Sequence, residues 1–255
     1  MDKDECDYFD DKEVSMRKLK SDCRERNSVV YTVTPKFKFF PSVACFSLTG
    51  TIIKSKYNRK NTIDNTCNII LWNHVVKYKL LELSKYASII IIADLTNKKI
   101  DTVKQIIAKT IQLLNVQCIF IASTKDNCYK KPNTNMWKII KQVYAYKKKS
   151  IVTNKSIFIG NNAGRINRVY NDNSDVDRAF ANNVNLCFST PEKYFLDDET
   201  VDTWRWNKSI ITMKQREDLY QESKKLVEPD VQKILFNLMD ELDKNIFIIM
   251  ILGLP

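Results

Sequence analysis

The chain has 255 residues, of which 44% are hydrophobic and 11% aromatic, so it is long enough to bury a substantial core. No run approaches the roughly 18 consecutive apolar residues that span a bilayer, and the N-terminus lacks the basic-then-apolar layout of a secretory signal. Seven scattered cysteines without a Cys-x-x-Cys pair indicate reduced thiols, so we expect an intracellular protein, nuclear or cytoplasmic, without a membrane partner.

The formal net charge of +11 is unevenly distributed. Residues 1–13 hold seven acidic residues and two lysines, so the remaining chain is more basic than the total suggests. We expect residues 1–27 to be an acidic, disordered leader. The basic body favours a polyanionic partner, nucleic acid above all, over a surface charged only for solubility.

Short apolar runs alternate with amphipathic stretches along residues 28–200, which is typical of a parallel α/β sheet. The predicted strands are Val43–Leu48, Ser88–Ala93, Gln117–Ala122, Ser156–Gly160 and Val184–Phe188. Helical spacing of apolar residues predicts helices at Asp101–Asn115 and Met136–Lys147. Strand–helix–strand order places a ligand crevice at the carboxyl ends of the strands.

The remaining chain, residues 201–255, is predicted to be a helical linker that runs into a further strand. Residues 213–243 have the pattern of two helices, and Asn245–Leu252 is a strand-like apolar segment. Trp204 and Trp206 alternate on one face and are expected to pack against the body rather than stack on bases.

The chain contains only four glycines: Gly50, Gly160, Gly164 and Gly253. All four follow or end predicted strands, where an α/β sheet builds its site. In so glycine-poor a sequence, we expect each to stand where the backbone requires positive φ or a close approach.

Several segments resemble the phosphatase part of the polynucleotide kinase 3′-phosphatase family, within the haloacid dehalogenase-like superfamily. Phe46–Thr51 is similar to the Phe-Asp-x-Asp-Gly-Thr opening of that superfamily. The stretches similar to later family motifs, in the family's order and spacing, are Tyr129–Pro132 with Met136-Trp137, Ile159–Arg165, Asp177–Asn183 and Phe188–Glu192. The resemblance implies an α/β fold, a haloacid dehalogenase-like Rossmannoid parallel sheet flanked by helices.

The end of the chain adds a further resemblance. Phe247–Pro255 is similar to the strand and first residues of the family's kinase phosphate loop, without its Gly-Lys-Ser/Thr. We therefore expect 201–255 to hold the linker and the first strand of a truncated kinase domain, with no kinase activity of its own.

The resemblance also implies which residues would carry the chemistry, and most of them are changed. In the family, two aspartates form an aspartyl-phosphate and shuttle protons, and a third helps them bind Mg²⁺; here these positions read Ser47, Thr49 and Asn161. The position that contacts the phosphate aligns with Ala93, or with Asp94 or Thr96 if the register slips. A lysine that neutralises the phosphate is retained as Lys131.

These departures predict that the phosphatase reaction is lost. Serine is a weak nucleophile without a base, threonine cannot shuttle protons as a carboxylate does, and Mg²⁺ needs carboxylate ligands. We therefore expect no catalytic residue to be intact and no cofactor, with Asp177 as the one candidate residual metal ligand. Without acids to offset it, Lys131 would lie unpaired in a neutral-to-positive pocket, where it would either shift its pKa or recruit an anion.

Phosphate-binding candidates are Lys131, Arg165 and Thr51, with a surface salt bridge as the alternative for Arg165. Candidates for contacting nucleic acid are basic residues near the motifs: Lys54, Lys56, Arg59, Lys60, Lys130 and Arg178. The run Lys147–Lys149 after Tyr146 is interpreted as a solvated helix end.

The leading hypothesis is a catalytically degenerate 3′-phosphatase-like domain that binds nucleic-acid ends, with DNA favoured, or a repair partner. The first alternative is an active Mg²⁺-dependent 3′-phosphatase in DNA repair that uses Asp94 or Asp177, with a kinase half beyond this chain. The second is a folded remnant that acts only through protein contacts. Abundant Asn, Lys and Ile are typical of A+T-rich genomes such as those of large DNA viruses.

Overall fold

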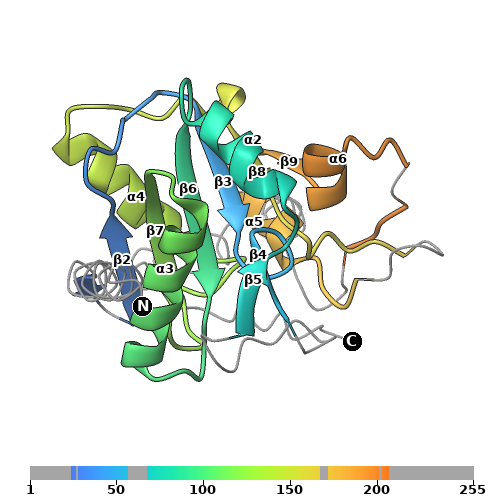
Figure 1. Ribbon diagram of the computed structural model, residues 1–255, viewed down its shortest axis with the longest axis horizontal. Coiled ribbons are helices and arrows are strands. Elements are labelled where there is room, and N and C mark those ends of the chain that lie inside the picture. Colours follow the sequence, from blue (N-terminus) through green and yellow to red (C-terminus); the bar gives the residue numbers. More distant parts are fainter. Residues whose placement is uncertain (1–23, 27, 57–67, 167–171, 201–202, 207–255) are drawn as a thin grey trace, which may run out of the picture. The chain divides into compact units, whose positions relative to one another are not determined.

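A computed structural model describes residues 24–26, 28–56, 68–166, 172–200 and 203–206 (Figure 1). Its centre is a seven-stranded sheet in the order β1-β2-β7-β6-β3-β8-β9. The strands of this sheet are β1 Arg24–Arg26, β2 Val29–Val33, β3 Val43–Ser47, β6 Ser88–Asp94, β7 Cys118–Ser123, β8 Ile157–Ile159 and β9 Cys187–Ser189.

The five strands from β7 to β9 run parallel, as the alternation of strands and helices in the sequence predicted. At one margin, β2 pairs antiparallel with β7, and β1 pairs antiparallel with β2. Parallel neighbours need a long crossover, and the helices supply these connections. Because the strands run in one direction, the residues that follow them meet at one edge of the sheet.

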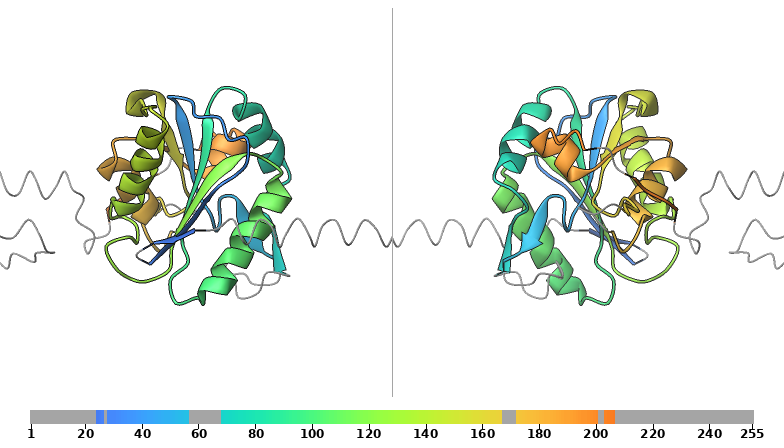
Figure 2. Two further views of the ribbon diagram at one scale, coloured as in Figure 1. Left: turned by 90° about the vertical axis from the view of Figure 1, so that its left-hand side faces the viewer. Right: turned by 90° about the vertical axis from the view of Figure 1, so that its right-hand side faces the viewer.

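Helices cover both faces of the sheet (Figure 2). One face packs against α2 (Val75–Leu83), α3 (Ile100–Leu114) and α6 (Pro191–Leu196), and the other against α4 (Asn135–Tyr146) and α5 (Val176–Asn183). A short 3₁₀ helix, η2 (Thr153–Lys155), leads into β8. The predicted helices at 101–115 and 136–147 correspond to α3 and α4.

Strand β6 shows why the central strands read as continuous apolar runs. Ile89 and Ile91 enter the core beneath α2 and α3, whereas Ile90 and Ile92 enter the core beneath α4 and α5. All four side chains are fully buried. Since side chains alternate between faces, a strand covered on both sides must be apolar at every position.

The last parallel strand differs from the prediction. Strand β9 is Cys187–Ser189, so only the end of the predicted strand Val184–Phe188 is extended. The amide of Val184 donates to the Phe180 carbonyl and that of Leu186 to the Ala181 carbonyl. These residues close α5, whose apolar C-terminal turn has the same composition as a short strand.

A second, two-stranded sheet follows β3 directly. It pairs β4 (Ile53–Ser55) antiparallel with β5 (Ile69–Leu71). The connection from β3 is a tight turn in which the Leu48 carbonyl accepts the amides of Ile52 and Ile53. Gly50 has a φ of +76° in this turn, a conformation that L residues with a Cβ rarely adopt. Strands β2, β4 and β5 were not predicted from the sequence.

Several predicted segments lie outside the described residues. They are residues 1–23 and 27 of the expected leader, the helices at 213–243, the strand Asn245–Leu252 and Gly253. Arg24–Arg26, which the sequence placed in the leader, form β1. Among the described helices, none has the length and apolar character needed to cross a membrane.

Candidate functional site

Polar side chains follow several parallel strands at their carboxyl ends, as the fold requires. Ser47, Asp94 and Ser123 are the last residues of β3, β6 and β7, and Asn161 lies just beyond β8. Lys131 reaches this edge from the loop between β7 and α4. The structure thus brings together residues separated by more than one hundred positions in the chain.

Lys131 is the centre of the site. Its Nζ donates to Ser47 Oγ at 3.1 Å and to Asp177 Oδ1 at 2.5 Å, and it lies 3.9 Å from Asp94 Oδ2. The second oxygen of Asp177 accepts the backbone amide of Asn162 at 3.1 Å. The Lys131 side chain is 3% exposed and that of Asp177 is fully buried. Both oxygens of Asp177 are therefore engaged.

This arrangement corrects the expectation of an unpaired lysine in a neutral-to-positive pocket. Burial lowers the pKa of Lys131, but the charges of Asp177 and Asp94 and the bond to Asp177 outweigh it and hold the pKa above its ordinary value. Lys131 is consequently an ammonium ion at neutral pH. Two carboxylates flank one cation, so the pocket has no excess of positive charge.

Asp94, rather than Ala93, faces this cluster. The Ala93 side chain lies in the core beneath α2 and α3, on the opposite side of the strand. Asp94 Oδ1 accepts the Ser123 hydroxyl at 2.9 Å and the Lys131 amide at 3.2 Å. Burial raises the pKa of Asp94 against the lowering effect of Lys131 and of these hydrogen bonds. The geometry therefore favours the shifted alignment that placed Asp94 in the site.

The loop after β3 meets the loop after β8 at Gly50 and Asn161. A Cβ on Gly50 would lie 2.5 Å from the Asn161 side-chain nitrogen, so the two segments are in close contact. Two buried oxygens here, Asn161 Oδ1 and Thr51 Oγ1, have no hydrogen-bond partner in the described part of the chain. Thr49 is half-buried in the same turn. Buried polar atoms are normally satisfied, so these two oxygens lack the partners that a water or a polar ligand would supply.

Gly160 explains how Asp177 reaches Lys131. A Cβ at position 160 would lie 2.6 Å from both Cβ and Oδ2 of Asp177. The end of β8 therefore has to be a glycine for the first turn of α5 to pack this closely. The expectation that glycine marks a close approach at the site applies here directly.

Arg165 is held away from a phosphate-binding role. Its guanidinium donates to Asp172 at 2.8 and 3.0 Å, to Glu192 at 2.9 Å and to the Asn161 carbonyl at 3.3 Å. The residue is 3% exposed. Burial lowers the pKa of Arg165, but its bond to Asp172 and the charges of Glu192 and Asp172 raise it more. The geometry favours an ion pair, buried rather than at the surface, that ties the β8 loop to α6.

The predicted nucleic-acid contacts do not form one cluster. Lys54 lies on β4 and Lys56 just beyond it, whereas Arg59 and Lys60 lie outside the described residues. Lys130 pairs with Asp126 at 2.9 Å. Arg178 donates its Nε–H to the Ala163 carbonyl at 2.7 Å, next to the β8 loop.

The residues at the three positions that are acidic in the family, together with Asp177, do not fit a magnesium ion. Proteins bind Mg²⁺ mainly through carboxylate oxygens. Both oxygens of Asp177 already accept hydrogen bonds, one from Lys131 and one from a backbone amide. Ser47, Thr49 and Asn161 offer only neutral oxygens. Within the described ranges, no cluster of three or more His, Cys, Asp or Glu side chains is arranged to hold a metal.

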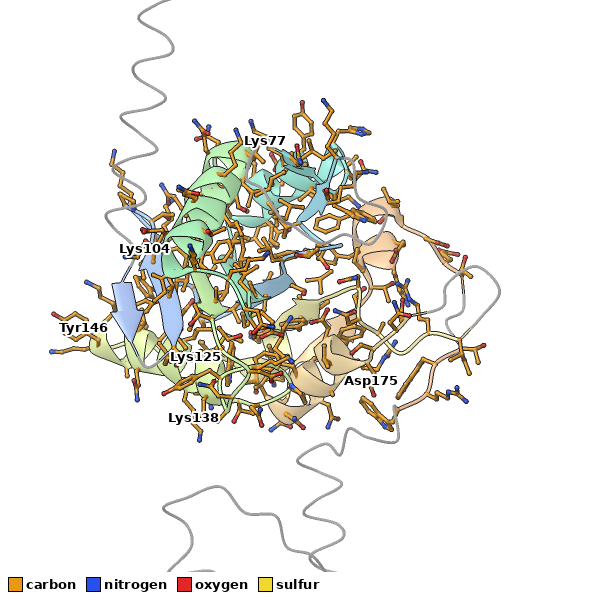
Figure 3. The ribbon with its side chains drawn as sticks, turned by 90° about the horizontal axis from the view of Figure 1, so that it is seen from below. Lys77, Lys104, Lys125, Lys138, Tyr146 and Asp175 are labelled. Carbon is orange, nitrogen blue, oxygen red and sulfur yellow. The ribbon has the colours of Figure 1, made fainter. Side chains whose placement is uncertain are left out.

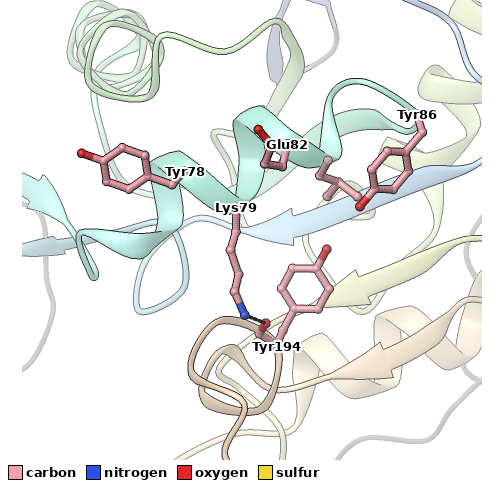
Figure 4. A pocket seen from close by; sticks show the side chains of 6 residues that line it. Tyr78, Lys79, Glu82, Tyr86 and Tyr194 are labelled. Carbon is pink, nitrogen blue, oxygen red and sulfur yellow. Dashed lines mark hydrogen bonds between the residues drawn. The ribbon is translucent and has the colours of Figure 1, made fainter.

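A separate cavity of about 360 Å³ lies between α2 and α6 (Figure 4). It is lined by Tyr78, Lys79, Glu82, Leu83, Tyr86 and Tyr194. Tyr86 stands two residues before β6 begins, whereas Asp94 ends that strand. The cavity therefore lies toward the amino ends of the strands and is not part of the site around Lys131.

Sequence reasoning missed the partners that shape this site. Ser123 and Asp172 were not singled out, and Glu192 was noted only as the end of a motif, although each holds a site residue in position. Ser123 had a signal, because it is the first polar residue after an apolar strand. Asp172 lies outside any regular element and had none.

Comparison with known proteins gives consistent matches. Residues 42–195 match the family described as polynucleotide kinase 3 phosphatase. A protein of Acanthamoeba polyphaga mimivirus named as a bifunctional polynucleotide phosphatase/kinase is 29% identical over 203 residues, covering 68% of this chain and 46% of that protein. The bifunctional polynucleotide phosphatase/kinase of Schizosaccharomyces pombe is 29% identical, covering 63% of this chain and 39% of its own length.

Among solved structures, a haloacid dehalogenase-like phosphatase of Mesorhizobium loti aligns with a TM-score of 0.43 at 13% identity, covering 54% of this chain and 72% of that one. The chain spans less than half the length of the mimiviral and fission-yeast relatives.

Proposed function

This chain belongs to the polynucleotide kinase 3 phosphatase family, and we propose that it is a catalytically degenerate member that binds nucleic-acid ends without hydrolysing their phosphates. The observation that carries the proposal is the position of the Lys131 ammonium, which donates to Ser47 and is held by the buried Asp177.

A serine nucleophile needs a base to accept its proton. The group bonded to Ser47 Oγ is the Lys131 ammonium, which donates a proton and has a raised pKa. Lys131 therefore cannot activate Ser47 near neutral pH. The commitment of Asp177 to Lys131 and to a backbone amide supports the same conclusion, because a carboxylate held in this way is not available to bind a metal ion or to accept a proton.

End binding is supported by the composition of the loop around the cluster. Asn161 and Thr51 each have a buried side-chain oxygen without a partner among the described residues, and the Asn161 amide and Thr51 hydroxyl can both donate to phosphate oxygens. Lys131 lies at the same edge of the sheet, Lys54 lies on β4, and Lys56 follows that strand directly. A terminal phosphate would replace Asp177 as the group that accepts a hydrogen bond from the Lys131 ammonium.

An active phosphatase is the second candidate, and one observation favours it. Asp94 and Asp177 both lie at the site, and the raised pKa of Asp94 is of the kind found in general acids. Its mechanism would require one of these carboxylates to leave its present partners. Action in DNA repair through a kinase half beyond this chain belongs to this candidate.

Binding and turnover are tested together on a single-stranded DNA oligonucleotide with either a 3′-phosphate or a 3′-hydroxyl. Fluorescence anisotropy with Mg²⁺ or with a chelator should show tighter binding of the phosphorylated end, unchanged by the metal. Phosphate release should stay at the level of a protein-free control. Metal-dependent release would overturn the proposal in favour of an active phosphatase.

The matched variant combines Lys131→Met with Asp177→Asn, which removes both buried charges and leaves neither unpaired. It should lose the preference for the phosphorylated end and still unfold cooperatively. Lys79→Met, on α2, is the control and should keep the preference, since Lys79 pairs with the exposed Asp197. Equal and weak binding of both ends by the wild type would leave the protein-contact alternative.

A further inference from the structure

A stack of three rings and one guanidinium lies beside the β8 loop. Arg178 lies over the Trp204 ring at 4.2 Å and over the Phe188 ring at 4.6 Å from their centroids. Trp206 meets Trp204 edge-on, with centroids 4.9 Å apart and planes at 77°. We call Arg178, Phe188, Trp204 and Trp206 the stacked cluster.

Backbone pairing attaches the stacked cluster to the same loop that carries Asn161. The Arg205 amide donates to the Gly164 carbonyl at 3.0 Å, and the Ile166 amide donates to the Thr203 carbonyl at 2.9 Å. Arg178 directly follows Asp177 and donates to Ala163 in that loop. The residues before and after Trp204 are therefore hydrogen-bonded to the loop that carries Asn161.

Trp204 is not buried by these contacts. It is 39% exposed, although it contacts Arg178 and Trp206, whereas Trp206 is half-buried. Both tryptophans pack, as expected, and Trp204 also keeps part of its surface open to solvent. A large aromatic ring that is fixed but still open to solvent can stack on another flat ring at little cost in conformational entropy.

The positive charge of Arg178, next to Trp204, favours a ligand whose flat rings are accompanied by negative charge. Arg178 places a cation against the same tryptophan, and the chain carries a net charge of +11. Single-stranded nucleic acid combines flat bases with phosphates, and its binding sites pair aromatic rings with basic side chains.

We propose that Trp204 stacks on an unpaired base of a single-stranded nucleic acid whose 3′ end lies at the Lys131 site. Arg178 then has two roles, since it supports the tryptophan from one side and attracts the backbone of the same strand. The inference rests on the proposed function and adds a base-binding position to it. It also makes the preferred ligand an end with unpaired bases rather than a closed duplex end.

The test compares a single-stranded oligonucleotide with one of the same length whose bases near the 3′ end are replaced by abasic residues. Wild-type protein should bind the normal strand more tightly, and its tryptophan emission should be quenched on binding. Trp204→Ala should weaken binding of the normal strand by about 5- to 100-fold and leave binding of the abasic strand unchanged. Trp204→Phe should retain most of the affinity.

Tyr78→Ala is the control, because Tyr78 is an aromatic residue of α2 that is 67% exposed and lines the cavity away from the site. It should leave both affinities unchanged. If Trp204→Ala binds the normal strand as tightly as wild-type protein does, the stacking inference fails while end binding stands. If wild-type protein binds neither strand, end binding and stacking fail together. If Trp204→Ala instead changes only the oligomeric state in sedimentation, the ring serves a protein contact and the inference is wrong.

Discussion

At the scale of single residues, the sequence motif and the structure differ on which groups neutralise Lys131. The motif identified Lys131, and the replaced acids suggested that it had lost its counter-ions. In the structure Asp177 supplies one counter-ion directly, at 2.5 Å, and Asp94 lies at 3.9 Å. A buried ion pair of this kind costs desolvation of both groups, so it is retained only with good geometry and further hydrogen bonds.

Asp94 gives a prediction of stability against pH. Its folded pKa is raised above 3.8, so its contribution is fully present below that pH and is lost as pH rises through the folded pKa. Asp94→Asn keeps the acceptor oxygen for Ser123 and the Lys131 amide but removes the charge. The variant should be more stable than wild type at pH 7, and the gap should close as the pH falls toward 3.8.

Urea unfolding at a series of pH values measures that gap. Asp126→Asn is the control, since the Asp126 side chain is 70% exposed and the change should leave the pH profile as it is. A gap between Asp94→Asn and wild type that stays constant with pH would show that the substitution acts through something other than this carboxyl.

At the scale of elements, the site is built by loops that are tied to one another. Arg165 in the β8 loop bonds Asp172 and, at the start of α6, Glu192. The sequence placed this arginine correctly in the motif that follows β8. It could not show that two carboxylates from other parts of the chain occupy its guanidinium.

Arg165→Lys tests this tie. Lysine keeps the charge but cannot donate in a planar fork to both oxygens of Asp172 while reaching Glu192 and the Asn161 carbonyl. We expect a loss of about 2 kcal/mol in the free energy of unfolding. Lys130→Ala, which breaks an exposed pair with Asp126, should cost less than about 1 kcal/mol. If both variants lose the same small amount in denaturant unfolding, Arg165 does not hold the loop.

At the scale of the whole molecule, basic residues stand on several different elements of the described chain. Examples are Lys77 on α2, Lys104 on α3, Lys125 in the loop after β7 and Lys138 on α4 (Figure 3). Charge distributed in this way raises the affinity for any polyanion but does not fix the position of a nucleic-acid strand on the protein. Specific binding must then come from the few residues near the site.

The salt dependence of oligonucleotide binding distinguishes these contributions. The logarithm of the association constant should fall linearly with the logarithm of salt concentration. Lys56→Ala, next to the turn that follows β3, should reduce the steepness by about 0.7, the value for one phosphate contact on a single strand. Lys85→Ala should leave the slope unchanged, because Lys85 pairs with Glu82 at 2.7 Å near the amino end of β6. Equal slopes for wild type and Lys56→Ala would remove Lys56 from the interface.

The sequence by itself determined the fold class, the central strands with α3 and α4, and the family. These features depend on local patterns, since a strand buried on both faces must be apolar and a loop at a strand end must keep its glycine. Tertiary structure alone decided the electrostatics of the site. Whether Lys131 is paired depends on how closely α5 approaches β8, and Gly160 permits that approach without revealing its partner. Charge interactions act through space, and neither the register of Asp94 nor the partners of Arg165 could be derived from positions along the chain.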